Sequence, residues 1–381
     1  MSQSKKNERM EYRIQMVDLK SQYNRYKSEF DDAVQKVLVS GNFINGKEVE
    51  EFSKSLSNWT GSKFVSPCAN GTDALQIAYM ALGLKPGDEV IVPSFNYVSA
   101  AEAAILLGLV PIFVDCDKRT FNISIESVLE SITPRTKALV AVHLFGQACD
   151  IESLENICSK NGIFLIEDNA QSIGAEILFG KFAGKKLGTI GIIGTTSFFP
   201  SKNLGCMGDG GAIFCQNEEL YNKIQIITNH GQKTRYQYDS IGLNSRLDTI
   251  QASILLVKMK YIDKFIKTRV ETADFYSKEL SKISGIITPL KSDWTTHVFH
   301  QYTIIFEDEY SRNLASDSLN SAGIQNMIYY PKPLHLHSAY ESESRPFGSL
   351  PVSEWLGSRV LSLPIHSEMN SDITKEISSF F

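Results

Sequence analysis

Short apolar runs alternate with amphipathic stretches between residues 64 and 166. The runs have the length of buried strands and fall at residues 64–65, 89–92, 110–114, 138–142 and 163–166. The stretches between them have the apolar spacing of helices and fall at residues 72–82, 99–107, 124–132 and 150–160. Strands that are apolar throughout and are separated by helices predict a parallel sheet buried on both faces.

The rest of the chain predicts a second, smaller unit after this sheet. A strand at 212–215 and a helix at 218–228 precede a polar, aromatic and irregular stretch at 230–246, which is typical of a functional loop. Residues 247–280 contain neither proline nor glycine and predict one long helical segment that links two domains. We therefore expect a large domain at 13–250 and a small C-terminal α+β domain at 251–381. The polar first residues look disordered.

The composition excludes several classes of protein. A net charge of −5 and an isoelectric point near 5.9 leave no broad basic surface for nucleic acid. The most apolar region, residues 90–114, contains Pro93, Glu102 and Gly108 and predicts no membrane span. The N-terminus lacks the apolar core of a signal peptide, so we expect a cytoplasmic protein. The cysteines form no C-x-x-C pair and the histidines no H-E-x-x-H motif, so we expect reduced thiols and no metal.

Two polar residues follow the predicted strands in positions that suit one cofactor. Asp168 ends the apolar run before it, and Lys202 lies in a polar turn after a strand that begins near Thr195. Pyridoxal phosphate needs an amine that forms an imine and an anion opposite its ring nitrogen. Taken singly, the two residues are also compatible with a strand-end cap and a solvated loop lysine.

Neighbouring motifs suit the other parts of such a cofactor. Residues 70–75 (Asn-Gly-Thr-Asp-Ala-Leu) join a strand to a helix whose free N–H groups suit a phosphate, although the motif is also an ordinary helix entry. Ser197 can donate to a phosphate oxygen, Tyr97 can face a ring, and Gln171 can donate to a ring hydroxyl. The glycines at 188, 191 and 194 lack the strand–turn–helix context of a dinucleotide site.

Taken in order, these motifs resemble the DegT-type nucleotide-sugar aminotransferases, which belong to the aspartate-aminotransferase class (fold type I) of pyridoxal-phosphate enzymes. The resemblance runs from about residue 17 to residue 366. It rests on the motifs at 40–44 (SGNFI), 70–75, 86–93 (PGDEVIVP), 143–147 (HLFGQ), 167–172 (EDNAQS), 197–205 (SFFPSKNLG), 208–211 (GDGG), 244–248 (NSRLD) and 330–335 (YPKPLH). It implies an α/β fold whose large domain has a mostly parallel seven-stranded sheet between helices. The sequence differs from the usual pattern of this family at two positions. Asn169 stands where alanine is usual, and Met207 replaces a common tyrosine.

The resemblance also implies roles for residues that would contact pyridoxal 5'-phosphate. Lys202 would carry the cofactor and shuttle protons, and Asp168 would keep the pyridine nitrogen protonated. Gln171 would face the 3-hydroxyl group, and Tyr97 would stack on the ring.

Other matched positions imply a phosphate site that two chains share. Gly71, Thr72 and Ser197 fall on the phosphate-binding positions. Asn244 matches a residue that reaches the phosphate from the neighbouring subunit. We therefore expect a homodimer with shared active sites.

The implied reaction moves an amino group from glutamate to a nucleotide-linked keto-sugar, for surface polysaccharide (O-antigen and lipopolysaccharide) biosynthesis. Residues 230–236 look most like those of members that aminate C3 of UDP-linked 2-acetamido-3-keto sugars, including the uronate. Relatives that act on dTDP-linked 3-keto- or 4-keto-6-deoxy sugars stay open as alternatives. We expect substrate contacts from Tyr330 and from cationic groups at the mouth of the site, for which the candidates are Lys233, Arg235, Arg246, Lys332 and His335.

Two other activities are disfavoured. Relatives that dehydrate sugars carry histidine at the position of Lys202. A cofactor-binding regulator would lack a working group or carry a DNA-binding extension. This chain keeps Lys202, Asp168 and Ser197 and shows no helix-turn-helix extension.

Overall fold

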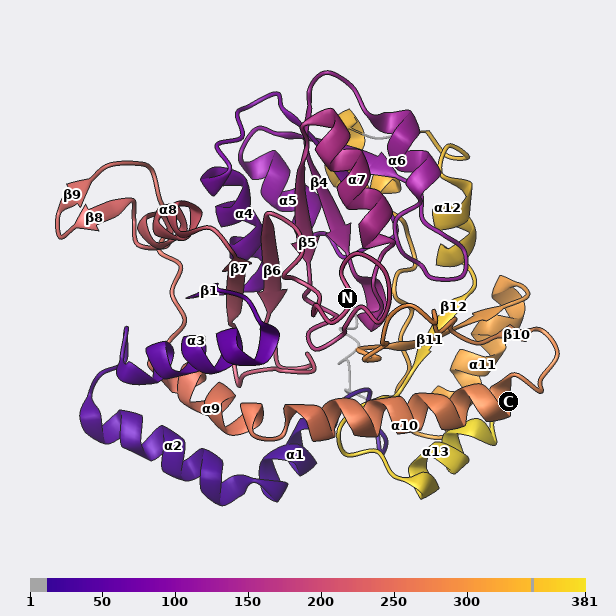
Figure 1. Ribbon diagram of the computed structural model, residues 1–381. Helices are drawn as coiled ribbons and strands as arrows, with labels where there is room; N and C mark the ends of the chain where they lie inside the picture. Colours follow the sequence, from indigo (N-terminus) through magenta and orange to yellow (C-terminus); the bar gives the residue numbers. More distant parts are fainter. Residues whose placement is uncertain (1–11, 344–345) are drawn as a thin grey trace, which may run out of the picture.

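The fold is built on one seven-stranded sheet (Figure 1). The computed structural model describes residues 12–343 and 346–381, so the expected disorder of residues 1–11 lies outside the described residues. Only β7 runs antiparallel to its neighbours, which confirms the expected mostly parallel sheet. The strands, in their order across the sheet, are β1 (Phe64–Cys68), β7 (Gly211–Cys215), β6 (Ile193–Ser197), β5 (Phe164–Asp168), β4 (Thr136–Val142), β2 (Glu89–Pro93) and β3 (Val110–Val114).

Helices cover both faces of this sheet, because its strands are apolar on both sides (Figure 1). One face packs against α4 (Gly71–Ala81), α5 (Ser99–Leu106), α8 (Glu218–Thr228) and α12 (Pro351–Gly357). The other face packs against α3 (Lys47–Thr60), α6 (Ile125–Ser131), α7 (Ile151–Asn161) and α9 (Thr249–Met259). As a result, β2 is buried at every residue.

A second apolar core lies around a small antiparallel sheet near the C-terminus. Its strands are β10 (Ile286–Ile287), β11 (Tyr302–Phe306) and β12 (Val360–Leu363), and its helices are α10 (Ile262–Leu280), α11 (Glu309–Ser321) and α13 (Ser371–Ser378). The beginning of the described chain joins this core. Ile14 forms a parallel bridge with Ile324, and the Met16 N–H donates to Gln325 Oε1 at 3.0 Å.

Two sequence predictions were wrong in detail. The helical segment expected at 247–280 is broken between α9 and α10, where Tyr261 leaves helical geometry (φ −121°, ψ 0°). Its ring packs against Tyr26 with centroids 4.2 Å apart, and its hydroxyl donates to Glu29. The stretch at 230–246 is not irregular throughout, because β8 (Gln232–Thr234) and β9 (Gln237–Tyr238) form a hairpin that projects from the body (Figure 1).

The remaining elements connect these units. At the start of the chain, α1 (Leu19–Arg25) and α2 (Lys27–Ser40) pack beside α9 and α10. Short 3₁₀ segments are η1 (Leu144–Gly146), η2 (Leu334–Leu336) and η3 (Ser338–Glu343). Within residues 12–343 and 346–381, no helix combines the length and the apolar character that a membrane crossing requires.

Candidate active site

The carboxyl ends of β4, β5 and β6 and the N-terminus of α4 border a cavity of about 580 Å³. Ligand sites in open α/β sheets form at this edge, where strand ends and helix N-termini meet. The cavity brings together eight sequence-predicted residues: Gly71, Thr72, Tyr97, Asp168, Gln171, Ser197, Lys202 and Tyr330. Sequence reasoning missed other lining residues, among them Asn96, Ser99, His300, Gln301 and Tyr329.

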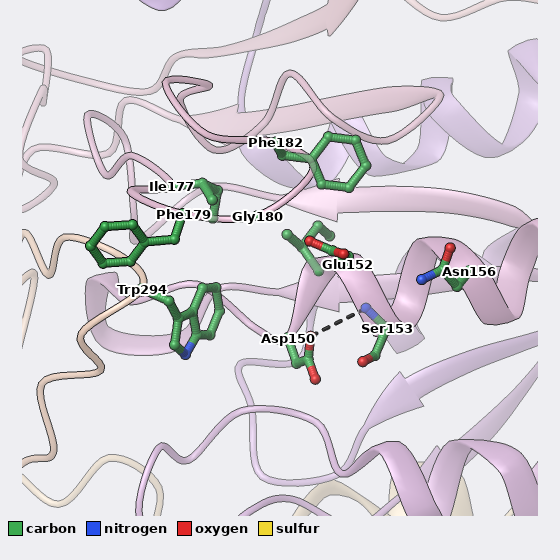
Figure 2. Close-up of a pocket in the computed structure, with 10 residues that line it drawn as sticks. Asp150, Glu152, Ser153, Asn156, Ile177, Phe179, Gly180, Phe182 and Trp294 are labelled. Carbon is green, nitrogen blue, oxygen red and sulfur yellow. Dashed lines mark hydrogen bonds between the residues drawn. The ribbon is translucent and has the colours of Figure 1, made fainter.

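A second pocket, of about 430 Å³, lies beside the N-terminus of α7 (Figure 2). Phe179 and Trp294 line one side, and α7 lines the other. The Asp150 carboxylate caps α7 by accepting from the Ser153 N–H at 3.2 Å. None of the sequence-predicted site residues lines this pocket, so we place the chemistry in the first cavity.

The turn after β6 holds Lys202 at the cavity. The Lys202 N–H donates to the Phe199 carbonyl at 2.8 Å, and the next side chain, Asn203, donates from Nδ2 to the Val298 carbonyl at 3.0 Å. Burial lowers the pKa of Lys202 to about 8, while the charge of Asp168 opposes the shift. The amine is therefore partly neutral, and hence nucleophilic, near physiological pH.

Asp168 ends β5 with its carboxylate in the same cavity. Its Oδ1 accepts from the Ala170 N–H at 3.0 Å, and its backbone carbonyl accepts from the His143 N–H at 3.1 Å. Burial raises the pKa of Asp168, while the Ala170 N–H and the charge of Lys202 oppose this rise. A carboxylate with few internal donors is poised to pair with a positive group of a ligand.

Glu167, on the opposite face of β5, has a supporting role that sequence reasoning missed. Its carboxylate is fully buried and accepts the N–H groups of Gly188, Ile190 and Gly191 at 2.8, 2.7 and 2.6 Å. The ring of His143 approaches the same carboxylate, with Nε2 3.1 Å from Oε1. Two of the three glycines that suggested a dinucleotide site, Gly188 and Gly191, therefore bind an internal carboxylate. The sequence alone could have indicated this role. Side chains alternate along a strand, so Glu167 must point to the face of β5 opposite to that of Asp168.

A cradle that suits a phosphate lies between α4 and the end of β6. Asn70 caps α4 by accepting the Asp73 N–H at 2.8 Å, which leaves the first N–H groups of the helix free for an anion. A Cβ on Gly71 would lie 2.8 Å from the Ser197 Cβ, and a Cβ on Gly211 would lie 2.5 Å from the Asn70 carbonyl. The close approach of these segments therefore requires glycine at both positions.

The aromatic side of the cavity joins the large sheet to the C-terminal part of the chain. Gln171 accepts the Phe145 N–H at 2.9 Å through Oε1 and donates from Nε2 to the Tyr330 hydroxyl at 3.1 Å. The rings of Tyr97 and Tyr330 have centroids 6.4 Å apart, and Tyr97 is 58% exposed. Tyr97 thus presents an open ring face, while both ends of the Gln171 amide already have partners.

Six sequence-predicted residues lie outside the cavity of this chain, and they include Lys233, Arg246 and Lys332. Asn244 is exposed and forms a bridge with Asn229, and Arg235 is exposed in the β8–β9 hairpin. His335 is only 1% exposed, with Nδ1 2.7 Å from Ser94 Oγ and Nε2 3.2 Å from Glu354 Oε1. Their roles toward a ligand stay predictions.

The residues of the cavity fit pyridoxal phosphate. An amine of lowered pKa, a carboxylate, a helix N-terminus with a cradle that a Cβ would fill, and an aromatic ring line one space. They match the aldehyde, ring nitrogen, phosphate and ring face of that cofactor. Asn169 does not disturb the arrangement, because its Nδ2 donates to the Leu187 carbonyl at 2.9 Å, away from the cavity.

Comparison with known proteins identifies the family of the chain. Residues 24–380 match the DegT/DnrJ/EryC1/StrS aminotransferase family. The UDP-2-acetamido-2-deoxy-3-oxo-D-glucuronate aminotransferase of Pseudomonas aeruginosa is 43% identical over 96% of this chain and 98% of its own. The UDP-N-acetyl-3-dehydro-alpha-D-glucosamine 3-aminotransferase of Acidithiobacillus ferrooxidans is 37% identical over 94% of each chain. A Streptomyces venezuelae structure in complex with a ketimine intermediate superimposes with a TM-score of 0.92, at 34% identity over 97% of each chain.

Proposed function

The chain belongs to the DegT/DnrJ/EryC1/StrS aminotransferase family, and we propose that it transfers the amino group of glutamate to the keto carbon of a nucleotide-linked sugar. Its cofactor is pyridoxal phosphate, as in the family. One observation carries the proposal: Lys202 and Asp168 face the same cavity, with the cradle formed by Gly71 and Ser197 at its edge.

The side chains divide the work of amino transfer between them. When bound, the cofactor supplies an aldehyde that takes up the amino group and a ring that withdraws electrons from the reacting carbon. The amine of Lys202 would hold the aldehyde end of the cofactor and, when neutral, would move the proton at the reacting carbon. Asp168 would stabilise positive charge on the ring nitrogen. The N–H groups of Gly71 and Thr72, with the Ser197 hydroxyl, would hold the phosphate.

We propose that the acceptor is a UDP-linked 2-acetamido-3-keto hexose or hexuronate, with amination at C3. The support is the identity to the two relatives whose names describe such reactions. A dTDP-linked 3-keto- or 4-keto-6-deoxy sugar is the second candidate. In either case the product would serve surface polysaccharide synthesis, and we expect the enzyme to work in the cytoplasm.

We propose that the working unit is a homodimer with shared sites. Among the described residues lining the cavity, Lys202 is the only lysine or arginine, whereas a sugar nucleotide carries a diphosphate. Lys233 and Arg235 sit in the projecting hairpin, from which a second copy could supply the missing charge (Figure 1). The hairpin also exposes Tyr236 (71%) and Tyr238 (61%).

Exposed apolar side chains support the same assembly. Phe43, Ile44, Phe199 and Met207 are each more than 40% exposed. Phe43 and Met207 are hydrogen-bonded to α9. The Phe43 carbonyl accepts the Thr249 N–H, and the Met207 N–H donates to Gln251. Contact with another chain would remove this apolar surface from water.

A panel of nucleotide keto-sugars tests the proposed function. Purified enzyme is supplied with glutamate and with UDP- or dTDP-linked 3-keto and 4-keto sugars, and amino-sugar formation is measured by mass spectrometry. We expect the highest kcat/KM with a UDP-linked 2-acetamido-3-keto sugar. Absence of amino-sugar formation with every member of the panel would reject the function.

The same panel tests the proposed role of Arg235. A guanidinium binds a carboxylate or phosphate through two parallel hydrogen bonds. If Arg235 binds the uronate carboxylate, Arg235→Ala lowers kcat/KM for the uronate about 10-fold or more while sparing the neutral sugar. A contact to the diphosphate would impair both substrates alike. Small and equal effects would remove Arg235 from the site, and the exposed Lys63→Ala serves as a control.

A further inference from the structure

Two hydroxyl groups meet at the wall of the cavity, next to the cradle between α4 and β6. Thr72 lies in the first turn of α4, Ser99 is the first residue of α5, and both line the cavity. Thr72 Oγ1 and Ser99 Oγ are 2.7 Å apart, which is the usual length of a hydrogen bond between hydroxyl groups. Both residues are half-buried, so a ligand in the cavity can reach them. The sequence motifs pointed to Thr72 but not to Ser99.

The pair leaves one hydroxyl proton without an acceptor. Each hydroxyl group has one proton to donate and two lone pairs that accept. Among the described residues, each of these two side chains has only the other as its hydrogen-bond partner. One proton is therefore used between the two oxygen atoms, and the other is free to be donated into the cavity. A ligand with acceptor oxygens suits this free proton.

The position of Thr72 indicates which hydroxyl group serves the ligand. Thr72 follows Gly71, whose backbone packs so closely on Ser197 that a Cβ at residue 71 would lie 2.8 Å from the Ser197 Cβ. Thr72 thus belongs to the cradle itself, whereas Ser99 belongs to the next helix and joins the cradle through Thr72. A phosphate offers several acceptor oxygens and is mostly a dianion near neutral pH. A phosphate in the cradle would accept from Thr72, which in turn would accept from Ser99.

We propose that Ser99 is a positioning residue for the phosphate of the cofactor: it donates to Thr72 Oγ1 and so directs the Thr72 proton to a phosphate oxygen. The proposal rests on the proposed function, because it concerns how the cofactor of that reaction is held. Hydrogen bonds in series polarise one another, so the bond from Ser99 strengthens the one from Thr72 to the phosphate. It also joins the segment that carries Tyr97 to the cradle.

Two substitutions and two ligands test the role of Ser99. Ser99→Ala removes one hydroxyl group, and Thr72→Val removes the other while keeping the shape of the side chain. Full-length protein freed of cofactor is titrated with pyridoxal 5'-phosphate and with pyridoxal, which lacks the phosphate, and absorbance gives each Kd. Thermal unfolding of each variant checks the fold. Ser362→Ala is a matched control, because it breaks a hydroxyl pair of the same 2.7 Å length, with Thr303 in the C-terminal core.

We expect Ser99→Ala to weaken binding of pyridoxal 5'-phosphate about fivefold, the size of one hydrogen bond. The Kd of pyridoxal should stay within about twofold, because pyridoxal has no phosphate to bind. Thr72→Val alone should show the same selective loss, at least as large. Adding Ser99→Ala to Thr72→Val should then change the Kd of pyridoxal 5'-phosphate less than about twofold, because Ser99 acts through Thr72. The control should alter neither Kd.

Three outcomes overturn the proposal. Equal losses for both ligands in Ser99→Ala would show that Ser99 shapes the cavity without serving the phosphate. Equal losses from Ser99→Ala with and without Thr72→Val would show that Ser99 contacts the phosphate directly. An unchanged Kd of pyridoxal 5'-phosphate in Ser99→Ala would leave the pair a purely structural contact.

The keto-sugar panel separates this proposal from the proposed function. An unmodified enzyme that binds pyridoxal 5'-phosphate but aminates no keto-sugar would reject the function, while the titrations would still decide the role of Ser99. An enzyme that aminates a keto-sugar but shows no coupling between Ser99 and Thr72 would reject the role of Ser99 alone.

Discussion

A Cβ on Gly71 would lie 2.8 Å from the Cβ of Ser197. The absence of a Cβ at residue 71 therefore lets the N-terminus of α4 lie close to the end of β6. The space between them suits a phosphate. Glycine is thus needed for close packing, and the two segments act as one binding unit.

Gly71→Ala should weaken binding of pyridoxal phosphate about 10-fold. Overpacking of this kind costs about 1–3 kcal/mol. The strain would displace the segments that are expected to bind the phosphate. Titration of the cofactor-free protein, followed by absorbance, measures the Kd. Ser197→Gly removes the obstructing Cβ, so adding Gly71→Ala to Ser197→Gly should cost much less. An equal cost in both backgrounds would contradict the steric explanation.

Lys202→Ala should abolish the covalent attachment of the cofactor and all amino transfer. Borohydride reduction followed by mass spectrometry measures the attachment. Lys258→Met is a matched control, because Lys258 is also buried with a pKa lowered to about 8 but does not line the cavity. The control should keep its attached cofactor. A reducible linkage in Lys202→Ala would show that another lysine does the work.

Asp168→Asn should reduce kcat about 100-fold or more, the usual scale for loss of one preorganised electrostatic group. The fold should persist, because the asparagine oxygen can still accept the Ala170 N–H. Steady-state kinetics and thermal unfolding measure the two effects. A rate near that of the unmodified enzyme would remove Asp168 from the mechanism.

The capture of cofactor by the cofactor-free protein should depend on pH with a midpoint near 8. Only the neutral amine attacks, and burial lowers the pKa of Lys202 to about 8. The rate should rise about tenfold per pH unit below this value and level off above it. The charge of Asp168 raises the pKa of Lys202, so Asp168→Asn should move the midpoint to lower pH. A midpoint near 10 in stopped-flow experiments would indicate an unperturbed lysine.

Mixing Lys202→Ala subunits with Asn244→Ala subunits should restore activity. In a shared-site dimer, each mixed dimer has one site with Lys202 from one chain and Asn244 from the other. Equal mixing should therefore recover about one quarter of the original activity. Mass spectrometry confirms subunit exchange. Complete inactivity after confirmed exchange would show that Asn244 does not serve the neighbouring chain.

Local signals were enough to predict much of this structure. Apolar runs and helix stops mark the seven-stranded sheet and its covering helices, and Asp168 and Lys202 follow strand ends, where ligand sites form. The break in the helix at Tyr261 could not be predicted from local sequence signals. The sequence there favours helix, and only the distant Tyr26 and Glu29 favour the departure.

Site residues fixed by distant contacts were also missed. His300 has no motif around it, and its place depends on Arg269 from α10 and Asn203 from the Lys202 loop. His335 shows the reverse case. Its motif suggested a contact with the substrate, whereas its ring lies buried between Ser94 and Glu354.

The pairing of the first described residues with the C-terminal core has a consequence for synthesis of the chain. Met16 and its partner Gln325 are 309 residues apart. At roughly 5–20 residues per second, a ribosome needs about 15–60 s to make the intervening chain. Met16 therefore leaves the ribosome long before its partner exists, and the contact between Met16 and Gln325 can form only near the end of translation. A tag fused at the N-terminus would thus lie close in sequence to a contact that forms late.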